Sequence, residues 1–440
     1  MKVYLLNPPY YPYFGRSMRW QDTGRAGTLY YPTWLSYTTG VVEQDHKVRL
    51  VDAPAWNWSR KDVKEDIKEF KPDLIVIDSS FPSLNNDIEV AKELKEVADT
   101  LQSENNLRDV RGISYKSDGE IIHNLDREFM TSEELDEIPF VSKVYKKHLN
   151  IKDYFLGSSL YPEVQIFTGR GCPFRCTFCS WPQTLMGRKY RVRSIHNVLD
   201  ELEWVQNNLR VKEVFYEDDT FTINKERVKE FCRKYKERGL DITWACNARA
   251  DLDLESMREM RKANCRLLIV GYESGSGEIL KRIRKGVTLA QIRDFAGNAI
   301  RAGLLVHGDF IIGLPGETKE TIMMTKKLIE ETRPDILQVS VASPFPGTDF
   351  YRWCNENSFL VTDDPNEYLD EGGHQKSVIS YPWLSSEDIT KAVDDLLKDY
   401  YLSASYVPVA FRQVFRRHGL DELRRVLYSA RMFLGYVFRR

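Results

Sequence analysis

The chain has 440 residues, enough for two or three domains with a sizeable hydrophobic core. A hydrophobic fraction of 42% and a formal net charge of −2 exclude an intrinsically disordered chain and a globally basic nucleic-acid-binding protein. The sequence has no apolar run of about 18 residues, and the N-terminal MKVYLL is too short for a signal peptide. We therefore expect a cytoplasmic protein with no nucleic-acid partner.

The first 130 residues alternate between strand-like and helix-like segments. Strands are expected over residues 2–7, 47–52 and 73–78, with helical spacing over 34–44, 61–70 and 87–100. Such alternation predicts a doubly wound parallel sheet that binds a ligand at the carboxyl ends of its strands. A hairpin, GISYKSDGEIIHN, then follows almost at once, with its turn at Ser117-Asp118-Gly119. Residues 1–130 are therefore predicted to form an abbreviated doubly wound, Rossmann-like domain.

A second alternation follows a linker over residues 131–160. Six strand-like segments are separated by helical stretches, such as 195–209 behind the capping Ser194. This pattern predicts an α/β fold, a partial (β/α)6 TIM-like barrel over residues 161–350, with functional residues at the strands' carboxyl ends. The expected strands are residues 163–168, 211–217, 242–247, 266–271, 304–312 and 336–342.

Residues 351–440 are predicted to be mostly helical, with a basic amphipathic end. A basic amphipathic helix is able to lie on an anionic membrane surface. Packing on its own domain with an exposed basic face explains the same pattern equally well. The arginines concerned are Arg412, Arg416, Arg417, Arg424, Arg425, Arg431, Arg439 and Arg440.

Seven cysteines, an odd number, argue against a disulfide framework. Only three of them are clustered, in GCPFRCTFCSWP over residues 171–182: Cys172, Cys176 and Cys179. The scattered ones are interpreted as small buried apolar residues: Cys232, Cys246, Cys265 and Cys354.

The spacing C-x3-C-x2-C brings three thiolates to one soft metal centre if the backbone wraps around it, and Gly169, Gly171 and Pro173 allow that bending. Zinc would need a fourth ligand, and the nearest candidate, His196, lies on an expected helix. Three thiolates on a four-iron cube leave one iron open to a substrate or cofactor.

This loop resembles the signature of the radical SAM superfamily, including the aromatic Phe178 just before the last cysteine. The resemblance implies a [4Fe-4S] cluster on the three clustered cysteines, with S-adenosylmethionine on the open iron. In that family one-electron reduction cleaves the sulfonium to a 5′-deoxyadenosyl radical, while the protein binds, orients and excludes water.

The resemblance covers roughly residues 160–350 and implies further cofactor contacts at the strand ends. Carboxylates after the second barrel strand suit the cosubstrate's ammonium, although the strand register leaves Glu217 and Asp218 as alternatives. A guanidinium after the third strand suits a carboxylate. Taken singly, each position is better explained as a rim turn or a buried ion pair, but polar groups at five successive strand ends after a three-cysteine loop favour cofactor binding. The cofactor-binding candidates are Phe178, Glu217, Asp218, Asn247, Arg249, Glu273, Ser274, Gly313 and Gly316.

The first domain, the hairpin and the motifs LDEIPF, GYESGS and FIIGLPGET are similar to the subfamily that carries a B12-binding domain. Within that subfamily, YYPTWLSYTTGVVE and VDAPA look most like members associated with hopanoid lipid biosynthesis. The chain departs from the subfamily in its shortened first domain and in having no D-x-H-x-x-G motif. Cobalamin binding is therefore left open.

The resemblance implies hydrogen-atom abstraction from an unactivated carbon, followed by cobalamin-dependent methylation or by rearrangement. The implied partners are a small-molecule or lipid-headgroup substrate and an electron donor such as flavodoxin or ferredoxin. A noncatalytic iron–sulfur protein remains the alternative. A tRNA-modifying methylthiotransferase is disfavoured, because those enzymes carry a second cluster and residues 1–150 contain no cysteine.

Overall fold

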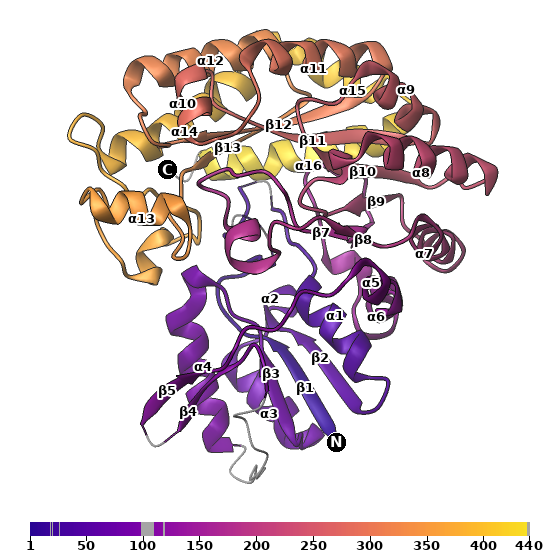
Figure 1. Cartoon of the computed structure of the whole chain (residues 1–440), viewed down its shortest axis with the longest axis vertical. Helices are drawn as coiled ribbons and strands as arrows, with labels where there is room; N and C mark the ends of the chain where they lie inside the picture. Colours follow the sequence, from indigo (N-terminus) through magenta and orange to yellow (C-terminus); the bar gives the residue numbers. More distant parts are fainter. Residues whose placement is uncertain (18, 20, 26, 98–109, 118, 438–440) are drawn as a thin grey trace.

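The computed structural model describes residues 1–440 except 18, 20, 26, 98–109, 118 and 438–440 (Figure 1). Two parallel sheets follow one another along the chain. The first has three strands in the order β2-β1-β3, drawn in indigo and purple at the bottom of Figure 1. Its strands are β1 (Lys2–Asn7), β2 (Lys47–Asp52) and β3 (Leu74–Ile77).

The three-stranded sheet buries both of its faces. Tyr4 and Leu6 point to one side and pack against Val63, Ile67 and other apolar residues of the neighbouring helices. On the other side, Val3 and Leu5 belong to the large core shared with the second sheet. The helices of this part are α1 (Thr33–Val42), α2 (Ala53–Trp56), α3 (Arg60–Phe70) and α4 (Leu84–Val97).

The strands and helices expected in this part of the chain are present, and residues 98–100 of the third expected helix lie outside the described residues. After the gap at residues 98–109 the chain forms the hairpin β4 (Ser114–Ser117) and β5 (Glu120–His123), whose strands pair antiparallel. Asp118, expected in its turn, lies outside the described residues. Two helices then lead to the second sheet, α5 (Ser132–Glu137) and α6 (Val141–His148).

Stacked tyrosines join the two sheets. The rings of Tyr31 and Tyr154 lie 4.0 Å apart. The Tyr154 hydroxyl donates to Asp52 at the end of β2 at 2.9 Å, and the Tyr31 hydroxyl donates to the carbonyl of Glu163 in the second sheet at 2.7 Å. These buried hydrogen bonds fix the first sheet against the second.

The second sheet is the expected half-barrel of six parallel strands, in the order β13-β12-β11-β10-β9-β6. Helices cover its outer face (Figure 1). The strands are β6 (Glu163–Ile166), β9 (Glu213–Tyr216), β10 (Thr243–Ala248), β11 (Cys265–Glu273), β12 (Leu305–Ile312) and β13 (Ile336–Val341). The helices are α7 (Ile195–Asn208), α8 (Lys225–Glu237), α9 (Leu254–Lys262), α10 (Gly277–Arg282), α11 (Leu289–Ala302) and α12 (Lys319–Thr332).

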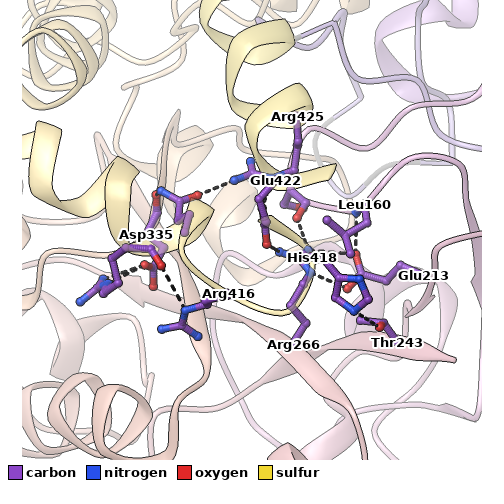
Figure 2. A network of polar contacts seen from close by, with 12 residues as sticks. Leu160, Glu213, Thr243, Arg266, Asp335, Arg416, His418, Glu422 and Arg425 are labelled. Atoms are coloured by element: carbon purple, nitrogen blue, oxygen red, sulfur yellow. Dashed lines mark hydrogen bonds and ion pairs between the residues drawn. The ribbon is translucent and has the colours of Figure 1, made fainter. Parts of the chain in front are cut away.

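The C-terminal region is helical, as expected, and its last helix packs on the half-barrel. Arg425 of that helix donates to Glu422, and Glu422 also accepts from Arg266 of β11, at 2.9 and 2.8 Å (Figure 2). Arg266 in turn pairs with Glu213 of β9. The helices are α13 (Asp349–Glu356), α14 (Ser386–Tyr401), α15 (Val407–Val414) and α16 (Gly419–Val437).

Several of the C-terminal arginines therefore serve packing. Arg412 pairs with Asp335, Arg417 pairs with Asp241, and Arg425 is buried. Arg424 points to solvent with 81% of its side chain exposed. Arg439 and Arg440 lie outside the described residues. Among the helices of the described ranges, none combines the length and the apolar character that crossing a membrane requires.

Candidate active site

The clustered cysteines lie on the loop that leaves β6 and leads to α7. Its two ends are held together by the antiparallel pair β7 (Gly169–Arg170) and β8 (Arg191–Val192). Gly171 has a φ of +86°, and a Cβ there would lie 2.2 Å from the carbonyl oxygen of Lys189, so the bend requires glycine. Inside the loop, Gln183 Nε2 donates to the carbonyls of Cys176 and Cys179 at 3.4 and 2.8 Å. These contacts wrap the backbone around one point.

All three clustered cysteines line a single cavity of about 140 Å³, together with the aromatic rings of Phe174 and Phe178. None of them is in a disulfide. Burial raises the pKa of Cys179 to about 12, although Arg19 opposes the shift. The free thiol is therefore protonated at neutral pH, and metal binding there releases the proton.

The donor set fits an iron–sulfur cube better than a single metal ion. Within the described part of the chain, no three His, Cys, Asp or Glu side chains converge as ligands of one ion. Thiolates on a four-iron cube each bind a different iron and need not converge on one point. The cavity with its three thiols and apolar aromatic wall is consistent with such a cluster.

Three acidic residues follow β9 and face three different ways. Asp219 lines the cysteine cavity: its Oδ2 accepts from the N–H of Gly171 at 2.9 Å, and its buried Oδ1 has no hydrogen-bond partner among the described residues. Asp218 is turned beneath the loop, where it accepts from both the N–H and the hydroxyl of Thr168 at 2.6 Å. Glu217 faces a second cavity and lies 3.7 Å from Arg19.

Of these three residues, Asp219 lines the cysteine cavity, whereas the expected Glu217 and Asp218 do not. Strand β9 ends at Tyr216, so the three acidic residues no longer alternate between the two faces of a strand. Burial raises the pKa of Asp219, and the opposing charge of Arg19 reduces the shift. An unpartnered buried carboxylate oxygen is costly, which favours a ligand with an N–H donor at this point.

Four other expected residues do line the cysteine cavity: Phe178, Asn247, Arg249 and Glu273. Arg249 lies flat over the Phe174 ring, 3.7 Å from its centroid, and donates from Nε to Asp251 at 3.1 Å. Its guanidinium therefore positions the cysteine loop, and its donors are not free to bind a carboxylate with two hydrogen bonds. Glu273 is paired with Lys285, with 2.5 Å between Oε1 and Nζ.

Three expected residues lie away from the cavity. Ser274 is buried and accepts from the N–H of Ser276. The carbonyl of Gly313 accepts a hydrogen bond from the hydroxyl of Tyr381 at 2.8 Å, so the C-terminal region covers the end of β12. A Cβ at Gly316 would lie 2.6 Å from Nη1 of Arg282. These two glycines accommodate neighbouring side chains of the protein, and no local pattern around them indicates those neighbours.

Sequence reasoning missed three charged residues of the cavity: Arg19, Lys285 and Asp309. Arg19 comes from the N-terminal segment, with its guanidinium 4.4 Å from the centroid of the Trp181 ring and its Nη2 donating to the carbonyl of Asp218. Nothing in the sequence near Arg19 signals this long-range contact. Asp309 did carry a signal, because His307 and Asp309 are spaced by two within the otherwise apolar LVHGDFII of β12.

A cobalamin bound to the first sheet would lie at the carboxyl ends of its strands, so the polar residues there show whether the site fits it. Most polar groups there satisfy one another: Arg16 donates to Asn7, to Asp87 and to the carbonyl of Pro8. Asp78, just after β3, keeps a buried Oδ2 without a partner. Burial raises the pKa of Asp78 to about 6. One orphaned acceptor at the ligand edge fits a molecule with N–H donors, such as the amide side chains of cobalamin.

Residues 166–329 match the profile of the Radical SAM superfamily. This segment is a radical SAM domain. The chain is 28% identical over 480 aligned positions to an uncharacterized methyltransferase of Pyrococcus horikoshii, covering 98% of this chain and 99% of that protein. It is also 30% identical to the hopanoid C-3 methylase of Methylococcus capsulatus, but over 48% of this chain and 40% of that protein.

Among solved structures, the radical SAM methyltransferase TsrM from Kitasatospora setae, with cobalamin and a [4Fe-4S] cluster bound, has a similar fold. The TM-score is 0.67 at 14% sequence identity, and the match covers 99% of each chain. At this identity the likeness establishes the fold. It extends over the first sheet, the half-barrel and the C-terminal helices alike.

Proposed function

We propose that this radical SAM enzyme is a cobalamin-dependent methyltransferase with a [4Fe-4S] cluster on Cys172, Cys176 and Cys179. The observation that carries the proposal is the convergence of these three thiols on one cavity, beside the unpartnered carboxylate oxygen of Asp219. The match over nearly the whole chain to a protein described as a methyltransferase supports the reaction class. When bound, the cluster supplies the electron that cleaves S-adenosylmethionine, and cobalamin supplies the methyl group.

The chain's own residues bind and orient these groups. Asp219 Oδ1 is the acceptor for the ammonium of S-adenosylmethionine, since a charged donor forms a strong hydrogen bond with a carboxylate. Arg249 holds Phe174 and so the outer part of the cysteine loop. The aromatic rings of Phe174, Phe178 and Trp181 limit the access of water to the cavity. Asp78 is the candidate contact for cobalamin on the first sheet.

One spectroscopic experiment tests cluster and cobalamin together. Full-length protein is reconstituted anaerobically with iron, sulfide and hydroxocobalamin, desalted, and examined by ultraviolet–visible absorption. We expect both chromophores to be retained, and the Asp78→Leu variant to lose cobalamin while it keeps iron. A wild-type protein that retains iron but no cobalamin would contradict methylation through cobalamin.

A noncatalytic iron–sulfur protein and a methylthiotransferase are separated by iron content and turnover. The four scattered cysteines, Cys232, Cys246, Cys265 and Cys354, are free and buried in the apolar core, which leaves no thiols for a second cluster in the described part of the chain. We expect about four iron atoms per chain. About eight would favour the methylthiotransferase, and a cluster without S-adenosylmethionine cleavage would favour the noncatalytic protein.

The remaining partners follow from the proposed reaction. A flavodoxin or ferredoxin is the expected electron donor. If the methyl group goes to an unactivated carbon, a hydrogen atom must first be abstracted from that carbon. The outer face of α15 and α16 exposes Phe415, Leu420 and Leu427 near Arg424, a composition suited to an anionic membrane surface that holds a lipid-headgroup substrate. Co-sedimentation with phosphatidylglycerol vesicles, compared with phosphatidylcholine vesicles, tests this contact.

A further inference from the structure

A second cavity, of about 360 Å³, lies inside the half-barrel beneath the cysteine cavity. Strands β10 to β13 line one part of it, and helix α16 lines another part together with Arg19, Arg25 and Tyr30 of the N-terminal segment. Four residues line both cavities: Arg19, Asn247, Ile269 and Asp309. A molecule in the lower cavity therefore adjoins the place where the three cysteines gather. Its volume lies in the usual range for small-molecule sites.

Most of the lower cavity is apolar, but Arg25 is a buried cation with an unused edge. Its side chain is 9% exposed and lies 5.3 Å from the centroid of the Tyr436 ring, and among the described residues neither its Nε nor its Nη2, both buried, has a partner within hydrogen-bond geometry. These two nitrogens form one side of the guanidinium, the side that grips a carboxylate or phosphate with two parallel hydrogen bonds. Leaving such donors unsatisfied inside a protein is costly.

The neighbouring acid does not fill this edge. Asp394 Oδ1 is 3.7 Å from Arg25 Nε, beyond hydrogen-bond reach, and it accepts from the hydroxyl of Tyr436 at 2.9 Å. Arg425, another arginine of this cavity, is different, because it donates to Glu422 (Figure 2) and its two other nitrogens donate to Gly157 and Gln413. Within the described part of the chain, Arg25 is thus a cation of this cavity whose Nε and Nη2 both lack a hydrogen bond.

The other titratable groups of the cavity are not strongly anionic. Burial, with the nearby charge of Arg425, lowers the pKa of His307 to about 3, so its ring is neutral. Burial raises the pKa of Glu217 to about 8, so this carboxyl is largely protonated at neutral pH, and burial also raises the pKa of Asp309. Burial raises the pKa of Asp22 to about 6, which leaves it mostly ionised. Protonated carboxyls donate hydrogen bonds to an anion and do not repel it.

We propose that the lower cavity holds the substrate, and that this substrate has an apolar body ending in an oxyanion, a carboxylate or a phosphonate, that Arg25 grips through Nε and Nη2. The identification of the bound molecule as the substrate rests on the proposed function, whereas the oxyanion contact with Arg25 does not. The apolar wall formed by residues such as Leu337, Tyr401 and Phe433 receives the body. The reacting carbon then lies toward Asn247 and Asp309, on the side of the cysteines.

Binding of simple probes tests the inference without turnover. Isothermal titration is carried out on the full chain, with and without the reconstituted cluster, using phenylbutanoate, phenylpropylphosphonate, phenylbutanol and phenylbutylamine. We expect the two anions to bind at least about tenfold more tightly than the alcohol, since a hydrogen bond to a charged group contributes roughly 1.5–3 kcal/mol. The amine is expected to bind most weakly. The stronger of the two anions identifies the class of oxyanion.

Two variants complete the test. Arg25→Gln should remove the preference for the anions. Arg25→Lys keeps the positive charge but not the two parallel donors of the guanidinium, so it should retain only part of that preference. Arg233→Gln, at an arginine of α8 whose side chain is 58% exposed, is the matched control and should bind as wild type does. Equal binding of acid and alcohol, tighter binding of the amine, or unchanged binding in Arg25→Gln would each overturn the inference. The comparison among probes on the wild-type chain decides it even if Arg25→Gln fails to fold. A chain that binds the anions but does not cleave S-adenosylmethionine would refute the catalytic proposal alone.

Discussion

Replacing Glu422 by glutamine should strongly destabilise the half-barrel, because this carboxylate bridges two buried guanidiniums. Its Oε1 accepts from Arg266 at 2.8 Å and its Oε2 accepts from Arg425 at 2.9 Å, and the three side chains are 1%, 6% and 4% exposed (Figure 2). Removing one partner of a buried ion pair costs about 3–5 kcal/mol. Arg266 keeps Glu213 as a partner, so we expect a loss near the lower end, about 3 kcal/mol.

Urea unfolding followed by tryptophan fluorescence measures this loss, with Arg424→Gln as a control on the same helix. Burial opposes ionisation of Glu422, but Arg266 and Arg425 outweigh it and lower its pKa. A carboxyl whose pKa is lower in the folded than in the unfolded protein stabilises the fold fully at pH values above its pKa in the unfolded chain. That stabilisation is lost as the pH falls through its pKa in the folded protein. The difference between wild type and Glu422→Gln should therefore shrink below about pH 4.5. A loss under about 1 kcal/mol, or one equal to that of Arg424→Gln, would refute the reasoning.

Three further changes test the site and its surroundings. Asp219→Asn should weaken S-adenosylmethionine binding by about 10-fold to 100-fold with iron content unchanged, measured by equilibrium dialysis; unchanged affinity would exclude Asp219 as the ammonium contact. Gly171→Ala should lower the iron bound after reconstitution, because its Cβ meets a backbone carbonyl, whereas Gly239→Ala, which also has a positive φ but no neighbour within 4 Å, should not. Normal iron content in Gly171→Ala would show that the loop adapts. Burial raises the pKa of Glu163 to about 8, so the folded state holds a proton that the unfolded chain releases, and stability falls as the pH rises from about 4.5 to about 8. Glu163→Gln should remove that fall in urea titrations at successive pH values, and an identical pH dependence in both proteins would contradict the assignment.

The sequence was sufficient for the architecture because each strand and helix is encoded locally. The first two strands were predicted at the bounds the structure has, and the six barrel strands within a few residues. Hydrophobic periodicity, capping residues such as Ser194 and the turn-forming glycines all act over short distances. The three-cysteine loop was equally predictable, because the spacing of its cysteines is a local property of the chain.

The details of the site were less predictable because they depend on distant segments. Arg19 and Arg25 reach the barrel from the N-terminal segment, and Tyr381 covers Gly313 from the C-terminal region. The choice among Glu217, Asp218 and Asp219 depends on where β9 ends, which periodicity fixes only to within a residue or two. The buried arginines of α15 and α16 read as a basic amphipathic pattern, because their partners, Asp335 and Glu422 among them, are paired only in the folded chain.

The central claim is that the three clustered cysteines hold a cluster that cleaves S-adenosylmethionine. The most direct measurement is the amount of 5′-deoxyadenosine formed when anaerobically reconstituted protein is mixed with dithionite and S-adenosylmethionine. We predict formation by the wild type and by Cys232→Ala, whose thiol is buried in the apolar core, and none by Cys172→Ala, Cys176→Ala or Cys179→Ala. No 5′-deoxyadenosine from the wild type, or continued cleavage by any of the three cysteine variants, would contradict the account.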